Sequence, residues 1–418
     1  MPGWRRLPVL VGTVVLAVLL AGCGGPKSGP PPNHETDLNK GANQNQAATQ
    51  AALMRAKLVA IFADRASLVA YTTHAAVESG MDSAEVRAAV DGLHNNRAHL
   101  IHQIDAAQGR RDPKAGIEEL GTFKESWEKR TSALLDYIHG TVSHDRALQS
   151  TAESHLHGVG RSLALGLEDL TDQVLSREDV HGMLAGHMEL TTGAIDSIVA
   201  GEPDAPDDVV DMARSSKEIA KNLARGFAVG TYALLGNAIA PGAKLRADLT
   251  SLFVEHVSQT VLLSEIVAAD GAQSDAAKTA EETLRANVDD LARRLEGIYG
   301  SSVADEFTGI FEEHVRQLIG YTEARASGDK PGTAPSDTQY ARDLSSFFQK
   351  VTDGHVNGQD MKAALSDQES AVEDTVNAVA EGSASAVEKL QLAEVRAEKP
   401  AKLLAIGIVE QFPKTYTG

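Results

Sequence analysis

Apolar residues recur every three or four positions along almost the whole chain from residue 47 onward, and this pattern constrains the fold more than any other feature. In "TLRANVDDLARRLEGIY", for example, one helix face would carry Leu284, Val288, Leu291, Leu295 and Ile298. Ala, Leu, Glu and Arg dominate, aromatic residues make up only 4%, and we find no alternating strand pattern. The sequence therefore predicts an all-α fold.

A repeated segment predicts how these helices are organised. "LFVEHVSQT" at 252–260 returns as "IFEEHVRQL" at 310–318, and related segments begin near Phe62, Phe123 and Leu184. The interval of about 60 residues accommodates two helices and their turns. We therefore expect repeated helical hairpins that form two consecutive antiparallel, four-helix-type bundles, over residues 47–176 and over residues 177–418 with the C-terminal helices. A division near residue 240 is the alternative. An open solenoid of hairpins is the alternative architecture.

The N-terminus carries a motif of its own. A basic segment, "MPGWRR", precedes an apolar stretch of about 16 residues, which is shorter than the roughly 20 that span a bilayer. Leu20, Ala21, Gly22 and Cys23 follow, so the start of the chain resembles bacterial lipoproteins with their lipobox. The resemblance implies that residues 1–22 are a signal peptide and that Cys23 becomes lipidated after cleavage. It also implies a cell-membrane anchor that faces the extracytoplasmic side.

Residues 23–46 are rich in Gly, Pro, Asn and Gln and have no apolar periodicity, which predicts a disordered tether. Three later segments, "HMELTTGAIDSIVAGEPD", "DLTSLFVEHV" and "GIVEQFP", resemble a group of secreted, all-helical proteins of Gram-positive bacteria. That resemblance implies the helical fold and no particular activity.

Charge and cysteine content exclude several kinds of site. The formal net charge is −19, and no basic stretch is present in the folded part, so we expect no nucleic-acid binding. An acidic surface also repels anionic lipids, so membrane contact should come through the lipid on Cys23 alone. Since Cys23 is the only cysteine, the folded part can have neither a disulfide nor a thiolate metal site.

Catalytic motifs are not found in the sequence. We find no His-Glu-x-x-His helix, no Gly-x-Ser-x-Gly elbow and no phosphate-binding loop. A di-iron bundle needs Glu-x-x-His on two helices, and only Glu178 and His181 match. The sequence therefore predicts a protein that is not an enzyme.

Three histidines, His187, His256 and His314, lie on apolar helical stripes and are expected to point inward. A buried neutral imidazole needs partners for both of its nitrogens. Those partners could be hydroxyls and carbonyls of the core, or the three histidines could share a metal or small ligand. The sequence leaves both interpretations open.

A local candidate for metal binding is "HGMLAGHM", which contains His181, Met183 and His187. Met183 and His187 are four residues apart and share a helix face, and imidazole with thioether suits copper. The sequence thus predicts a lipid-anchored, extracytoplasmic, non-catalytic helical-bundle protein with a binding or structural role at the cell envelope and no cofactor. The alternative is an envelope lipoprotein that binds copper or zinc through these residues together with His256 and His314. A partner protein of the envelope is possible, and the oligomeric state is not predicted.

Overall fold

A computed structural model of the chain describes residues 45–108, 113–230, 235–329, 334 and 339–416. Cys23, the signal peptide and nearly all of the predicted tether lie outside these residues. Within the described ranges every regular element is a helix, which confirms the all-α prediction. In chain order the elements are η1 (Gln46–Ala48), α2 (Gln50–Ser79), α3 (Ala84–Gln108), α4 (Pro113–Val142), α5 (Arg146–Leu170), α6 (Arg177–Ala200), α7 (Ala205–Gly230), α8 (Pro241–Asp270), α9 (Asp275–Tyr299), α10 (Ser301–Ala326), α11 (Tyr340–Val351), α12 (Gly358–Ala380), α13 (Ala386–Gln411) and α14 (Pro413–Tyr416).

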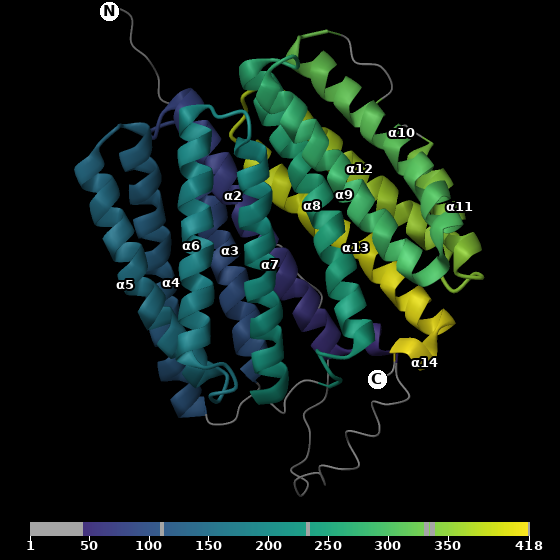
Figure 1. Ribbon diagram of the computed structural model, residues 1–418, viewed down its shortest axis with the longest axis horizontal. Helices are drawn as coiled ribbons and strands as arrows, with labels where there is room; N and C mark the ends of the chain where they lie inside the picture. Colours follow the sequence, from purple (N-terminus) through teal and green to yellow (C-terminus); the bar gives the residue numbers. More distant parts are fainter. Residues whose placement is uncertain (1–44, 109–112, 231–234, 330–333, 335–338, 417–418) are drawn as a thin grey trace, which may run out of the picture.

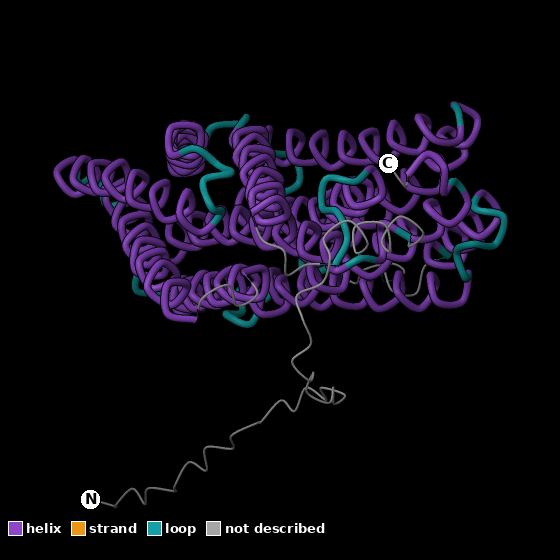
Figure 2. The backbone as a smooth tube through the Cα atoms, turned by 90° about the horizontal axis from the view of Figure 1, so that it is seen from below, coloured by secondary structure: helices purple, strands orange, loops and turns teal. Residues whose placement is uncertain are grey.

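Successive long helices pair as antiparallel hairpins that assemble into bundles, as the sequence pattern predicted (Figure 1). The five repeated segments fall on α2, α4, α6, α8 and α10, each the first helix of its hairpin. In Figure 1, α2 to α7 form the purple and teal side of the molecule, and α8 to α13 form the green and yellow side. Figure 2 shows the same helices from below, as tubes packed side by side.

A longer repeat, which the sequence analysis did not predict, joins three hairpins into one half of the molecule. Helix α2 and helix α8 both have 30 residues, and α3 and α9 both have 25. Gly80 and Gly271, at the ends of α2 and α8, have positive φ values of 83° and 85°, which an L side chain rarely adopts. The backbone N–H of each closes the preceding turn, on Ala76 O and Val267 O respectively.

The later helices of the two halves correspond as closely as the earlier ones. Thr171, after α5, donates its hydroxyl to Leu167 O, and Thr352, after α11, donates to Phe348 O in the same way. Helices α7 and α13, which begin at Ala205 and Ala386, are both 26 residues long. The repeat therefore divides the chain between α7 and α8. The predicted division into bundles at residues 176 and 177 falls in the turn between α5 and α6, and it stays a prediction.

The two halves meet along α2 and α8, which lie against each other at the centre. Two buried arginines in equivalent positions cross this junction. Arg55 donates to Ala238 O at 3.1 Å, and Arg246 donates to Ala47 O at 2.9 Å, so each half receives a donor from the other. One apolar cluster extends from α2 across α8 to α13, and a second joins α2 to the other helices of the first half, α3 to α7. The halves therefore share a continuous core.

Helix α8 is one of the most apolar of the described helices. It is long and apolar enough to span a membrane by length and composition alone, but 72% of its most apolar window is buried inside the fold. Its hydrophobic character is accounted for by its position between α2, α9 and α13.

Candidate functional site between the two halves

The structure separates the three inward histidines that the sequence analysis grouped together. His256 on α8 and His314 on α10 meet in the core of the second half, with ring centroids 5.6 Å apart. His187 lies on α6 in the first half, where burial lowers its pKa and the guanidinium groups of Arg130 and Arg65 lower it further. Two neighbouring cations disfavour a metal ion at His187.

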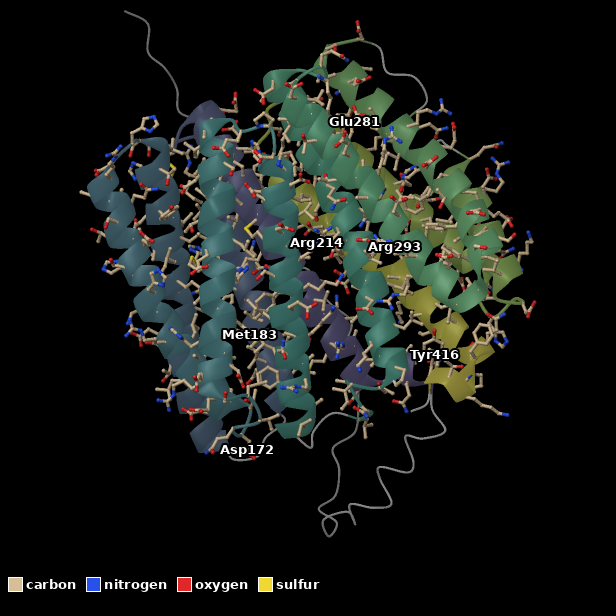
Figure 3. All side chains as sticks on the ribbon, viewed as in Figure 1. Asp172, Met183, Arg214, Glu281, Arg293 and Tyr416 are labelled. Atoms are coloured by element: carbon tan, nitrogen blue, oxygen red, sulfur yellow. The ribbon has the colours of Figure 1, made fainter. Side chains whose placement is uncertain are left out.

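His181 and Met183 also lie on α6, and both side chains are half-buried; Figure 3 labels Met183. Within the described residues, no group of three or more His, Cys, Asp or Glu side chains converges to hold a metal ion. Metal binding at His181, Met183 and His187 stays a prediction.

The His256–His314 pair belongs to a buried polar cluster that also contains Tyr340 and Glu369. The His314 ring stacks on Tyr340 at a centroid distance of 3.7 Å, and its Nε2 lies 3.4 Å from Glu369 Oε2. Among the described residues, the nitrogens of the His256 and His314 rings and the Tyr340 hydroxyl have no hydrogen-bond partner. Such unpaired polar groups each destabilise a core by about 1–3 kcal/mol.

Burial governs the protonation of this cluster. It lowers the pKa of His256 to about 4, and the nearby Asn287 amide opposes that shift only in part. It lowers the pKa of His314 well below its ordinary value and raises that of the Glu369 carboxyl well above. All three groups are therefore favoured in their neutral forms, and His314 and Glu369 do not form an ion pair.

Sequence reasoning missed Glu369 and Tyr340. A signal for Glu369 was present, because Gln368 and Glu369 interrupt the inward stripe formed by Ala364, Leu365 and Val372 on α12. No comparable signal existed for Tyr340, since an aromatic residue at a helix start is ordinary.

A pocket opens where the central helices α2 and α8 meet α7 and the start of α13. It encloses a volume of about 40 Å³ and opens to solvent, and its walls are mostly apolar. Helix α2 contributes Ala63, Ala66 and Ala70, which share one face, α7 contributes Val210 and Ala213, and α13 contributes Leu390. We call this the seam pocket.

The repeat explains why the seam pocket is open on this side of the molecule. Counted from the helix starts, Gln391 on α13 corresponds to Val210 on α7. Glu394 on α13 corresponds in the same way to Ala213 on α7. On the α13 side, Gln391 donates to Asp64 at 3.2 Å, and Ser258 donates to Glu394 at 2.7 Å, so polar side chains fill the space. Smaller apolar residues at the equivalent positions of α7 leave room for a ligand.

Polar groups converge on the α8 wall of the seam pocket. Glu255, Gln259 and Glu265 line it along one helix face. Gln259 is only 8% exposed, and no described residue donates to its Oε1. Burial raises the pKa of Glu265 well above its ordinary value, and no cation pairs with this carboxyl within the described part of the chain. An unpartnered buried acceptor beside an apolar wall is typical of a ligand site.

An acidic groove, with a volume of about 380 Å³, continues from the seam pocket between α7, α8 and α9. Val210, Glu255 and Gln259 line both spaces. The groove adds Asp207, Asp211, Arg214, Glu282 and Asp290. Figure 3 labels Arg214 on α7 and Arg293 on α9, the helices on either side of this region.

The charges of the groove are unequally paired. Arg214 binds Asp211 at 3.1 Å, and Arg293 binds Asp290, whereas Asp207 and Glu282 have no cationic partner among the described residues. Burial raises the pKa of Asp207, and the nearby carboxylates of Asp211 and Glu282 reinforce the shift. The groove therefore has a negative potential that is not neutralised from within.

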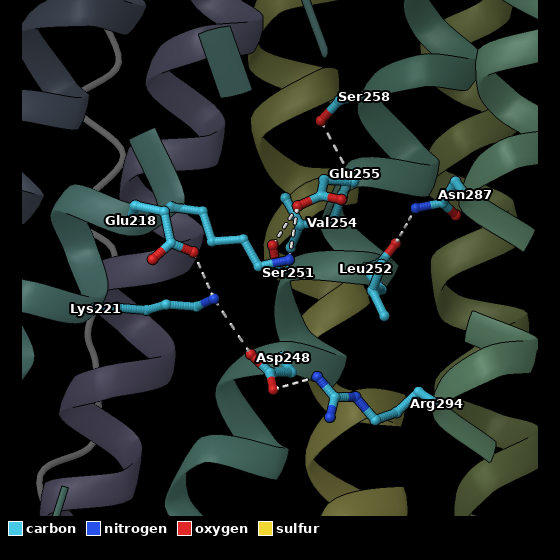
Figure 4. Close-up of polar contacts among 11 residues, drawn as sticks. Glu218, Lys221, Asp248, Ser251, Leu252, Val254, Glu255, Ser258, Asn287 and Arg294 are labelled. Carbon is cyan, nitrogen blue, oxygen red and sulfur yellow. Dashed lines mark hydrogen bonds and ion pairs between the residues drawn. The ribbon is translucent and has the colours of Figure 1, made fainter. Parts of the chain in front are cut away.

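Below the acidic groove, ion pairs tie α7, α8 and α9 together (Figure 4). Lys217 Nζ lies 3.5 Å from Glu255 Oε1, and Lys221 Nζ lies 3.7 Å from Asp248 Oδ1. Asp248 also binds Arg294. Asn287 on α9 donates to Leu252 O at 3.1 Å. These contacts fix the helices that form the walls of the groove.

No protein-family model matches the chain, and comparisons with curated proteins and with solved structures find no significant match.

Proposed function

We propose that the chain is a lipid-anchored, non-catalytic binding protein on the extracytoplasmic side of the cell membrane, and that it holds a small ligand in the seam pocket. The buried, unpartnered Gln259 Oε1 at the wall of this apolar pocket carries the proposal. Pockets with apolar walls and a few converging polar groups are the usual form of small-molecule sites. The lipobox at Leu20–Cys23 and the tether support the location.

The proposal can be tested without knowing the ligand, by filling the pocket. Ala213→Leu places a larger side chain in the pocket, where its half-buried alanine lines one wall. Ala185→Leu on α6 is a matched control, since Ala185 is also half-buried but does not line the pocket. Native mass spectrometry of protein isolated from its own membranes should detect a bound small molecule on the unmodified chain and on Ala185→Leu, but not on Ala213→Leu. The same excess mass over the polypeptide in all three folded chains, or no excess mass in any of them, would contradict the proposal.

A second candidate function is metal binding, and the His256–His314 pair favours it. The four imidazole nitrogens have no hydrogen-bond partner among the described residues, and one of them, His314 Nε2, lies 3.4 Å from the Glu369 carboxyl, which can also bind a metal. If this candidate is right, untagged protein unfolded and refolded with copper or zinc should retain near-stoichiometric metal and melt at a higher temperature. A His256→Leu, His314→Leu double variant, which places no ligating atom at either position, should lose both effects. Refolded protein that retains no metal and shows no change in melting temperature would refute this candidate.

A further inference from the structure

We propose that the ligand of the seam pocket is a linear aliphatic diamine or polyamine, an inference that rests on the proposed binding function. The first step is the chemistry of the available polar groups. Gln259 offers an unpartnered acceptor oxygen, and Glu265, Asp207 and Glu282 offer carboxyl groups that no described cation pairs with. A ligand that satisfies these groups must bring hydrogen-bond donors and positive charge.

The hydroxyl donors of the site are already occupied and its charged groups are mostly carboxylates, which disfavours an anionic ligand. Ser67 donates its hydroxyl to Ala63 O, and Ser258 donates to Glu394. Thr283 donates to Ala280 O, and the Arg214 guanidinium is paired with Asp211. An incoming carboxylate or phosphate would face several carboxylates of the groove, with only the Gln259 amide and the remaining N–H groups of Arg214 as donors.

The shape of the site indicates that the positive charges of the ligand are separated by an apolar chain. Gln259 and Glu265 are about 9 Å apart along α8, at about 1.5 Å per residue. Between them the opposite wall consists of alanines of α2. Beyond Gln259 the acidic groove begins, with Asp207 and Glu282. One ammonium group would lie at Glu265, methylene groups would cover the alanine wall, and another ammonium would lie at Gln259 and the groove.

The carboxylates of the groove suit a bare metal ion less well than they suit a polyamine. Within the part of the chain that the structure describes, no three carboxylate or imidazole groups converge closely enough to share one ion. Acids spread along a groove are matched by charges spread along a chain.

Three probes of the same length class test the inference on the full chain by isothermal titration calorimetry. Diaminooctane carries a charge at each end, octylamine carries one charge, and octanediol is the neutral analogue. We expect one diamine per chain, and at least about tenfold weaker binding of octanediol, which corresponds to about 1.4 kcal/mol of lost charge-assisted hydrogen bonding. Octylamine should bind with intermediate affinity.

Two variants locate the binding. Glu265→Gln should weaken diamine binding about tenfold and leave octanediol binding nearly unchanged, because a single charge-assisted contact is removed. Glu312→Gln makes the same charge change at an exposed position on α10, away from the site, and should leave the diamine affinity within about twofold.

The outcomes separate the two proposals. If octanediol and diaminooctane bind with equal affinity and Ala213→Leu blocks both, the diamine inference is overturned and the binding function is supported. If the diamine binds at many sites per chain, and Glu265→Gln and Glu312→Gln weaken its binding equally, the binding is a counterion effect and the inference is overturned. Failure of all three probes to bind would count against both proposals.

Discussion

Acidification from pH 7 to pH 5 should destabilise the unmodified protein by about 2 kcal/mol more than it destabilises a His256→Met variant. Burial lowers the pKa of His256 to about 4 in the folded chain, against about 6.5 for an unfolded histidine. The unfolded state therefore takes up a proton first. Stability from the neutral imidazole is complete above pH 6.5 and is lost as the pH falls from 6.5 towards 4. Methionine has a similar volume and does not titrate, so the variant lacks this loss.

Urea unfolding of both proteins at pH 7 and pH 5 measures this difference. His139→Met, at an exposed position on α4, is the matched control and should follow the unmodified protein. Buried Glu369 and Glu394 act in the opposite direction, since their pKa values are raised and their contribution to stability is lost as the pH rises. Comparing each variant with the unmodified chain removes that contribution. An equal loss of stability for His256→Met and the unmodified chain would refute the assignment of His256 as a buried, neutral group.

Changing Cys23 to Ala should move nearly all of the protein from the membrane fraction to the soluble fraction. Each buried methylene of an acyl chain contributes about 0.8 kcal/mol to membrane binding, so two or three chains give a stable anchor and their loss removes it. The acidic folded part, with a net charge of −19 for the whole chain, would not hold the protein on anionic lipid.

Fractionation of cells that express either chain measures this release. Lys27→Ala, in the same tether, alters the local charge but leaves the lipobox intact and should stay in the membrane fraction. Retention of the Cys23→Ala protein on the membrane would contradict the lipid anchor.

The helical fold could be predicted because a spacing of three to four residues between apolar positions is a local property of each helix. The hairpins followed from the interval between similar segments. The duplication of three hairpins was harder to predict, because equivalent positions have diverged in chemistry. Arg65 and His256 occupy the same position in α2 and α8, and Ala213 and Glu394 occupy the same position in α7 and α13.

The candidate site was only partly accessible from sequence. His256 and His314 were identified as inward-pointing and do meet, since each lies on the apolar face of its own helix. The seam pocket depends on four helices, of which only α7 and α8 are consecutive in the chain. It is defined by small residues such as Ala63 and Ala213, which in sequence look like ordinary helix formers. A space left by small side chains becomes visible only when the opposing helices are in place.

The central claim is that the seam pocket holds a ligand, and the most direct measurement is a crystal structure of the protein isolated from its own membranes without exchange of bound molecules. The account predicts elongated density between Ala66 and Glu265, with one end within hydrogen-bond distance of Gln259 Oε1. A pocket closed by its own side chains, or filled only by water with Gln259 bonded to another residue of the chain, would contradict it.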